Sequence, residues 1–163
     1  MAIKGENGIL YIWDGTSAYK PVACLTSNSL NTTVATIESR TKCDPGVVIK
    51  SAGLFAYTID AEGEYIDTTS VGGDHTKDSH DALLVLQQAK QLITWKLNTN
   101  VNDAGSIKYY GQALITDLKL TQGSGDEVST FTASLDGSGA ISQTDPNAWG
   151  SVFTAQFSVE FGL

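Results

Sequence analysis

The sequence predicts a mainly β domain, or a β-rich α+β domain, in which one helix lies across a sheet. Apolar and polar residues alternate along most of the chain, and a single segment keeps helical spacing. In addition, only 17% of the 163 residues are charged. Hydroxyl and amide side chains must therefore cover most of the surface, which suits extensive β-structure because threonine fits a pleated surface. The length is most simply that of one domain.

The clearest strand signal is the stretch from Lys108 to Ser142, which predicts a hairpin with its turn at 122–126. One face of its second strand is apolar, and the other carries hydroxyls at Thr130, Thr132 and Ser134. The Gly-Ser-Gly run at 137–139 is interpreted as a closing turn. The first strand is apolar on both faces, so we expect a second layer or a neighbouring subunit to cover it.

Further strands are predicted on both sides of the helix, at 8–13, 20–31, 32–39, 54–64, 92–98 and 153–161. In the strand 54–64, Phe55, Tyr57, Ile59 and Ala61 are expected on the buried face, with Asp60 and Glu62 on the acidic outer face. The helix is predicted over 78–89, with Asp78 as its N-cap and Asp81 in its first turn, where the helix dipole favours negative charge.

The charge balance argues against several classes of partner. The chain has ten basic and eighteen acidic residues, which gives a formal net charge of -8. This balance disfavours tight binding to nucleic acid phosphates. No stretch has the length of a membrane-spanning helix, and the first residues lack the apolar core of a signal peptide. Cytoplasmic synthesis, with no membrane partner, is the expectation.

No pattern in the chain predicts a catalytic, metal or cofactor site. The segment 73–81 holds both histidines and several acids, but His75 and His80 lie five apart across a loop–helix junction, and a solvated loop is the favoured interpretation. Cys24 and Cys43 are expected as free thiols, with a single bridge between them as the alternative. The Asp60–Glu62 pair is more typical of a solvated or lumen-facing acidic stripe than of catalytic carboxylates. The three tryptophans are expected in core or interface packing.

The order of these segments resembles the major tail proteins, or tail tube proteins, of long-tailed bacteriophages. Four segments carry the resemblance: the Thr/Val-rich strand pair ending at 38–44, the alternating strand to Glu62-Gly63, the helix 78–89 with its following strand, and the segments 110–116 and 130–139. The resemblance covers most of residues 1–142, taken as a tail-tube-like β domain, and 143–163 is expected to be an arm or strand extension of it. It implies two packed antiparallel sheets, sandwich- or barrel-like, with one flanking helix.

The resemblance also implies a structural protein of the virion tail that is not an enzyme. Its copies would form rings, six to a ring, that stack into a hollow tube in the bacterial cytoplasm, and double-stranded DNA would pass through that tube without specific binding. Tape measure, tail terminator and baseplate proteins are the further partners that it implies. The alternatives are the inner tube of a contractile tail, tailocin or secretion apparatus and, in a different class, a monomeric β-sandwich binding module.

Two sets of residues follow as hypotheses. Because a wall poor in Lys and Arg does not retain DNA, the lumen-facing candidates are Thr36, Glu38, Asp60, Glu62, Thr130 and Thr132. Contacts between subunits or rings are expected from the loops 40–53 and 65–77 and from the arm 136–163. The candidate contact residues are Arg40, Lys42, Asp44, Val71, His75, Trp149, Phe153, Phe157 and Phe161.

Overall fold

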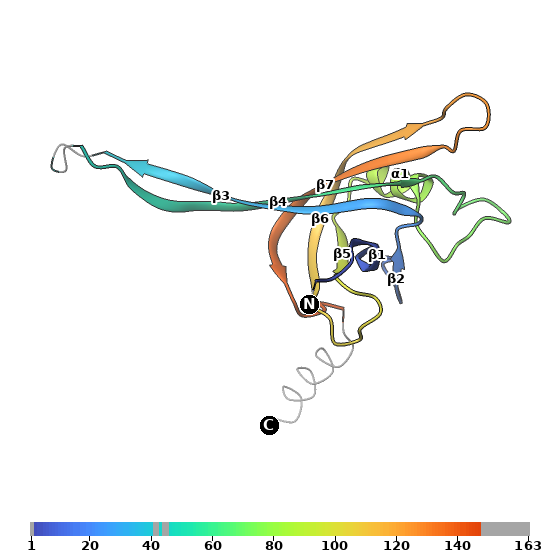
Figure 1. Cartoon of the computed structure of the whole chain (residues 1–163), viewed down its shortest axis with the longest axis horizontal. Helices are drawn as coiled ribbons and strands as arrows, with labels where there is room; N and C mark the ends of the chain where they lie inside the picture. The colour runs from blue at the N-terminus through green and yellow to red at the C-terminus, as the bar shows by residue number, and fades with distance from the viewer. Residues whose placement is uncertain (1, 41–42, 44–45, 148–163) are drawn as a thin grey trace, which may run out of the picture.

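The computed structural model describes residues 2–40, 43 and 46–147, which form one antiparallel sheet with a helix packed against it (Figure 1). The strands are β1 (Ile9–Trp13), β2 (Tyr19–Pro21), β3 (Leu25–Ser39), β4 (Ile49–Glu64), β5 (Ile93–Asn98), β6 (Lys108–Thr121) and β7 (Thr130–Ser142). The helix α1 (His80–Ala89) follows β4, and a 3-10 turn η1 (Gly5–Asn7) precedes β1. The predicted β-rich class with one helix is confirmed.

All seven strands belong to a single sheet of order β2-β1-β5-β6-β7-β4-β3, so two separate sheets are not confirmed. One half of the sheet contains β2, β1 and β5, and the other contains β7, β4 and β3. The strand β6 joins the two halves because it is long enough to pair with both β5 and β7. Residues 108–113 of β6 pair with β5, and its remaining residues pair with β7 alone. Register shifts next to Tyr110 and Ile115 mark β-bulges, which bend a strand and increase its twist without ending its pairing.

The core lies between the two halves of this folded sheet. Tyr57 of β4 and Trp95 of β5 are fully buried, with ring centroids 5.6 Å apart, and the Trp95 indole N–H donates to the Tyr57 hydroxyl at 3.2 Å. The Tyr57 hydroxyl in turn donates to the Gln112 carbonyl. The strands β4 and β5 therefore face each other across the core, and Leu83 of α1 joins the same cluster.

Several local predictions are wrong for identifiable reasons. The segments 20–31 and 32–39 are not two strands, because β3 runs unbroken from Leu25 to Ser39 along β4. The 137–139 run is not a turn: it lies within β7, and Gly139 takes a positive φ of 82° where β7 bulges opposite β6. The helix N-cap position is held by Ser79 rather than Asp78. The backbone of Asp78 is attached to the end of β2, because its N–H donates to the Pro21 carbonyl and its carbonyl accepts from the Ala23 N–H.

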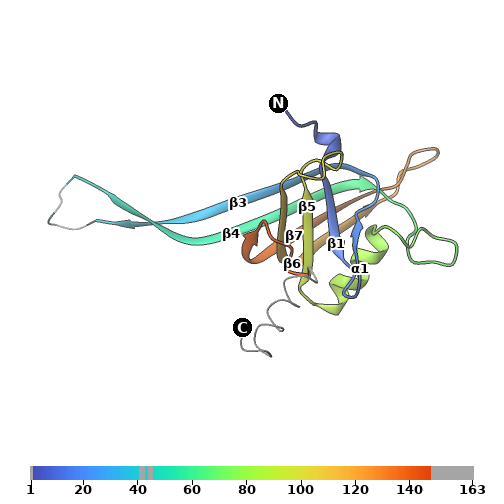
Figure 2. The same ribbon diagram turned by 90° about the horizontal axis from the view of Figure 1, so that it is seen from below.

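The hairpin predicted over 108–142 is confirmed, with Phe131, Ala133 and Leu135 buried on one face of β7. A second hairpin was not anticipated at its full length. Strands β3 and β4 stay paired from Leu25–Gly63 to Ser39–Ile49, and their outer half projects well beyond the body of the sheet (Figures 1 and 2). We call the part formed by residues 33–40 and 46–56 the arm; from here on, this name does not refer to the C-terminal stretch 136–163.

Candidate assembly surfaces

The arm carries apolar side chains that the protein leaves in water. No side chain between positions 33 and 40 or between 46 and 56 is buried. Leu54 is 84% exposed and Phe55 46% exposed. The other exposed apolar side chains of the arm are Val34, Ile37, Val47, Val48 and Ile49. Apolar groups clustered on one projecting element mark an interaction surface far more often than scattered ones do.

The arm is a regular two-stranded ribbon with one irregularity. A register shift between Val34 and Thr36 sets Gly53 and Leu54 of β4 opposite Ala35 of β3. A Cβ atom on Gly53 would lie 2.9 Å from the Ala35 carbonyl oxygen, so the close approach at this bulge needs glycine. Beyond it, an exposed Lys50–Glu38 ion pair at 3.4 Å joins the two strands. Because a two-stranded ribbon has little stability of its own in water, the arm would gain stability from a surface to lie on.

A polar surface covers the outward face of the β7–β4 half of the sheet. The pairings Glu64–Thr130, Glu62–Thr132 and Asp60–Ser134 place hydroxyl and carboxylate side chains side by side. The Ser134 hydroxyl donates to Asp60 at 2.7 Å. This surface, which we call the polar face, includes four lumen-facing candidates, Asp60, Glu62, Thr130 and Thr132. The other two, Thr36 and Glu38, lie beyond the bulge on the arm, so the structure does not bring them together with these four.

The loop between β4 and α1 is fixed by carboxylates. Asp81 of α1 accepts hydrogen bonds from both the amide and the hydroxyl of Thr68 and of Thr69, at 2.7–3.1 Å. Burial raises the pKa of Asp81, but these hydrogen bonds outweigh it, so the pKa lies below its usual value. The contact candidates Val71 and His75 are exposed on this loop. No three His, Cys, Asp or Glu side chains of the described residues converge in a way that would hold a metal ion.

The remaining contact candidates are distributed between the arm and the parts outside the described residues. Arg40 is exposed at the end of β3's side of the arm. Outside the described residues lie the candidates Lys42, Asp44, Trp149, Phe153, Phe157 and Phe161.

Cys24 and Cys43 are both exposed free thiols. Within the described part of the chain, α1 is too short and too polar to cross a bilayer.

Sequence reasoning did not identify the apolar surface of the arm. Phe55 was expected on a buried face because it continues the alternation of Tyr57 and Ile59, but no second layer reaches that far along β4. Two signals were available: Leu54 interrupts the alternation, and Val47-Val48-Ile49 is an apolar run next to the polar loop 40–46.

Among the carboxylates of the described residues, Asp78 is the one whose pKa burial raises clearly, to about 6. The side chain is 8% exposed, and Lys20 offsets the burial only in part. Since the folded state binds this proton more tightly than the unfolded state, the free energy of unfolding should fall as the pH rises from about 4 to about 6, and then level off.

Asp78→Asn should remove that pH dependence and raise the free energy of unfolding at pH 7 by about 2 kcal/mol. Denaturant unfolding of the unassembled protein between pH 4.5 and 8 measures both effects. Because Asp81 is also close, Asp81→Asn serves as the control: it should lower stability at pH 7, because one of the two oxygens that accept the loop hydrogen bonds becomes an amide donor. An unchanged pH profile in Asp78→Asn would contradict the assignment.

Comparison with known proteins agrees with this geometry. The family described as phage tail tube protein matches residues 2–143. No curated protein sequence gives a significant match. Among solved structures, the tail of an empty gene transfer agent particle with C6 symmetry matches with a TM-score of 0.69 at 15% identity, covering 88% of this chain and all of the other.

Two further solved structures extend the likeness of the fold. The tail tube of SPP1 matches with a TM-score of 0.63 at 13% identity, covering 85% of this chain and 77% of the other. The sheath–tube complex of an extracellular contractile injection system matches with a TM-score of 0.60 at 13% identity, covering 86% and 90%. Because the family match spans most of the sequence and the fold agrees with it, the chain belongs to the phage tail tube protein family.

Proposed function

We propose that copies of this chain assemble into six-membered rings that stack into the hollow tube of a virion tail, and that double-stranded DNA leaves through this tube. The observation that most supports assembly is the arm, because its Leu54 and Phe55 side chains stay in water unless a second copy covers them. Burying apolar surface is the main driving force of protein association. The role needs no catalytic site, metal or cofactor.

The ring number rests on the relatives rather than on this chain. The gene transfer agent tail has C6 symmetry, and its fold is that of this chain. Closed rings also suit a sheet with a long strand at its edge, because β3 pairs on one side only within the part of the chain that the structure describes. Pairing or covering that edge in a ring removes a template for uncontrolled aggregation.

The polar face supports a role as the wall of the lumen. It carries carboxylates at Asp60 and Glu62 and hydroxyls on β7, and β6 adds Asp117 and one cation, Lys119, opposite Ser134 and Thr132. The carboxylates outnumber the lysine, so the face as a whole attracts water more than phosphates. A wall without clustered Lys and Arg gains no free energy from counterion release, so DNA passes without being held. In this proposal Asp60, Glu62, Thr130 and Thr132 line the lumen, whereas Thr36 and Glu38 lie on the arm that contacts the next copy.

Glu62→Lys should turn this wall into a surface that retains DNA. One new cation per copy, repeated around each ring and along the tube, should bind short duplex DNA at low salt, with affinity that falls steeply as salt increases. DNA held in the lumen should be protected from a nuclease. The matched control is Glu127→Lys in the exposed turn between β6 and β7, whose bound DNA should be digested. Equal nuclease sensitivity in both variants would exclude Glu62 from the lumen.

Electron microscopy of the purified protein tests the assembly itself. At high concentration, hollow tubes built from six-fold rings are expected, whereas a protein that stays monomeric at every concentration would overturn the proposal and favour a monomeric binding module. Solved relatives include both a phage tail tube and a contractile injection system. A sheath gene beside this one would indicate a contractile tail. Assembly in the host cytoplasm, and contacts with tape measure, terminator and baseplate proteins at the tube ends, complete the proposal.

A further inference from the structure

The arm carries exposed apolar side chains on both faces of its ribbon. Directly paired residues of an antiparallel ribbon share a face, and successive residues of a strand alternate between the faces. Val34 pairs with Phe55, and the Phe55 ring centroid lies 6.1 Å from that of Tyr57. Val34 and Phe55 therefore lie on the face that continues the buried face of β4. Leu54 is next to Phe55 in β4 and so lies on the opposite face.

An ion pair shows which side chains share a face beyond the bulge of the arm. Glu38 pairs with Lys50, and the 3.4 Å between Glu38 Oε1 and Lys50 Nζ places both side chains on one face. The extra residue of the bulge belongs to β4, so β3 alternates without interruption from Val34 to Glu38. The ion pair therefore lies on the face of Val34, which we call the ion-pair face.

The other face, which we call the leucine face, collects the apolar side chains of the outer part of the arm. Ile37 and Ile49 each precede a member of the ion pair, so both lie with Leu54 on the leucine face. All three are half-exposed or more, and Val34 and Phe55 on the ion-pair face are about half exposed. A partner on one face alone would therefore leave the apolar side chains of the other face in water.

The arm also differs in charge from the rest of the chain. Its basic residues Arg40 and Lys50 outnumber its one acidic residue, Glu38, whereas the whole chain has a formal net charge of -8. The remainder of every copy is therefore strongly acidic. Apolar contact and charge attraction both favour another copy of the chain as the partner of the arm.

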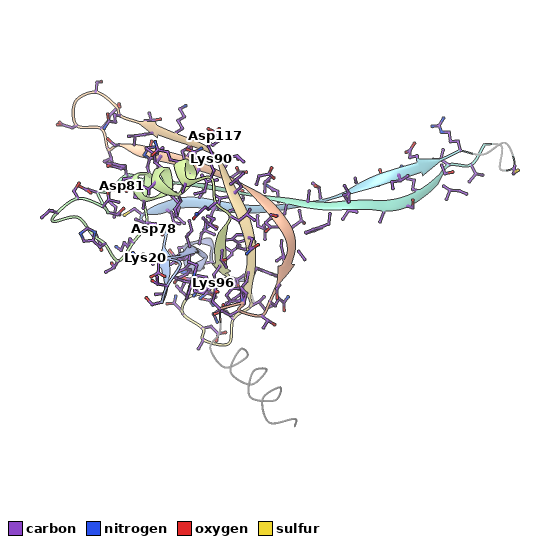
Figure 3. All side chains as sticks on the ribbon, turned by 180° about the vertical axis from the view of Figure 1, so that it is seen from behind. Lys20, Asp78, Asp81, Lys90, Lys96 and Asp117 are labelled. Atoms are coloured by element: carbon purple, nitrogen blue, oxygen red, sulfur yellow. The ribbon has the colours of Figure 1, made fainter. Side chains whose placement is uncertain are left out.

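The end of the molecule opposite the arm offers a surface of this kind. It is formed by α1, the loop before α1 and the β6–β7 turn (Figures 1 and 2). Asp81 and Asp117 lie at this end (Figure 3), and the helix and the turn expose Val85, Glu127 and Val128. A basic, apolar element at one end and an acidic surface with exposed apolar side chains at the other suit a head-to-tail contact, which closes into rings or extends a filament.

We propose that the arm lies between two other copies of the chain, one on each of its faces. One copy would cover both faces only by enclosing the ribbon. The outer part of the ribbon fills on the order of 2,000 Å³, at about 20 Å in length and about 10 Å in width and thickness. The groove between the segments 5–9 and 21–28 holds about 770 Å³ and is too small for it. This inference rests on the proposed assembly and adds that each face of the arm has a copy of its own.

Val34→Thr and Ile37→Thr test the two faces separately. Each replaces a half-exposed apolar side chain by a polar one that is also β-branched, so the Tm of the monomer should not change. Each variant should need roughly tenfold more protein to assemble, because buried apolar surface is lost on its face. Val34→Ile and Ile37→Val are the matched controls, since they stay apolar, and should assemble at close to the original concentration. Normal assembly of either threonine variant would show that its face is uncovered, which overturns the proposal.

Cross-linking counts the copies that contact one arm. The register places Ser51 on the leucine face and Ala52 on the ion-pair face, and both are exposed. Ser51→Cys and Ala52→Cys, in a protein whose Cys24 and Cys43 are serine, each carry a benzophenone. The doubly labelled protein is mixed with a large excess of unlabelled copies, assembled and irradiated, so that a labelled arm meets only unlabelled copies.

Covalent trimers are expected from the double label, because the two faces react with different copies, and dimers are expected from either single label. Dimers as the largest product of the double label would overturn the proposal and leave the proposed tube intact. Cross-links within one chain alone would overturn it as well. If rings or smaller oligomers form without tubes, the proposed function fails, and the number of linked copies still decides how the arm is covered. A protein that stays monomeric overturns both.

Discussion

Leu54→Asp is expected to abolish tube formation while leaving a folded monomer. Leu54 is the most exposed large apolar side chain of the arm's β4 strand and, at 84% exposed, has little contact with the body to lose. In the proposed tube its side chain is covered by another copy, and burial of a leucine stabilises by about 1.5–3 kcal/mol. A buried, unpaired carboxylate costs still more. Because every copy in every ring carries the change, assembly should be lost at concentrations at least tenfold above those at which the original protein forms tubes.

Leu54→Met is the matched control, because it keeps an apolar side chain of similar volume, and it should assemble normally. Sedimentation and electron microscopy measure tube formation, and thermal unfolding of the monomer should give the same Tm for all three proteins. Normal tubes from Leu54→Asp would show that the arm does not lie on a second copy. A lowered Tm would show instead that Leu54 stabilises the monomer.

Gly137→Ala is expected to give the largest loss of monomer stability. A Cβ atom at position 137 would lie 2.3 Å from a ring carbon of the fully buried Tyr57, closer than any real contact. Tyr57 has little room to move, because its ring meets Trp95 edge-on and its hydroxyl bonds to both Trp95 and Gln112. Overpacking of this kind costs about 3 kcal/mol. For a protein of this length that corresponds to a Tm about 10 °C lower.

Gly5→Ala is the control for this substitution, because nothing lies within 4 Å of a Cβ at position 5 and it should leave the Tm unchanged. Combining Gly137→Ala with Tyr57→Leu should cost less than the two separate changes together, since the smaller side chain makes room for the methyl group. Strict additivity of the two changes, measured by denaturant unfolding, would show that Tyr57 and position 137 do not meet in the core.

The sequence predicted those features that local pattern controls. Helical spacing located α1 to within two residues at its start, and strict alternation assigned Phe131, Ala133 and Leu135 to the buried face of β7. The same alternation placed Asp60 and Glu62 on the outward face of β4. It misplaced Phe55, because alternation tells which residues share a face and not how far along the strand the second layer extends. Asp78 fits an N-cap pattern, but backbone pairing with β2, which no local pattern reveals, attached it elsewhere.

By itself, the sequence determined the β-rich class, the helix α1, the two faces of β4 and β7 and the resemblance to tail tube proteins. All of these follow from the spacing of side chains along a few residues. Only the tertiary structure decided that the strands form one sheet, that the arm projects with Leu54 in water, and that the Tyr19 hydroxyl bonds to Asp145. These features depend on strand pairing and on contacts between residues far apart in the chain, which spacing alone cannot specify.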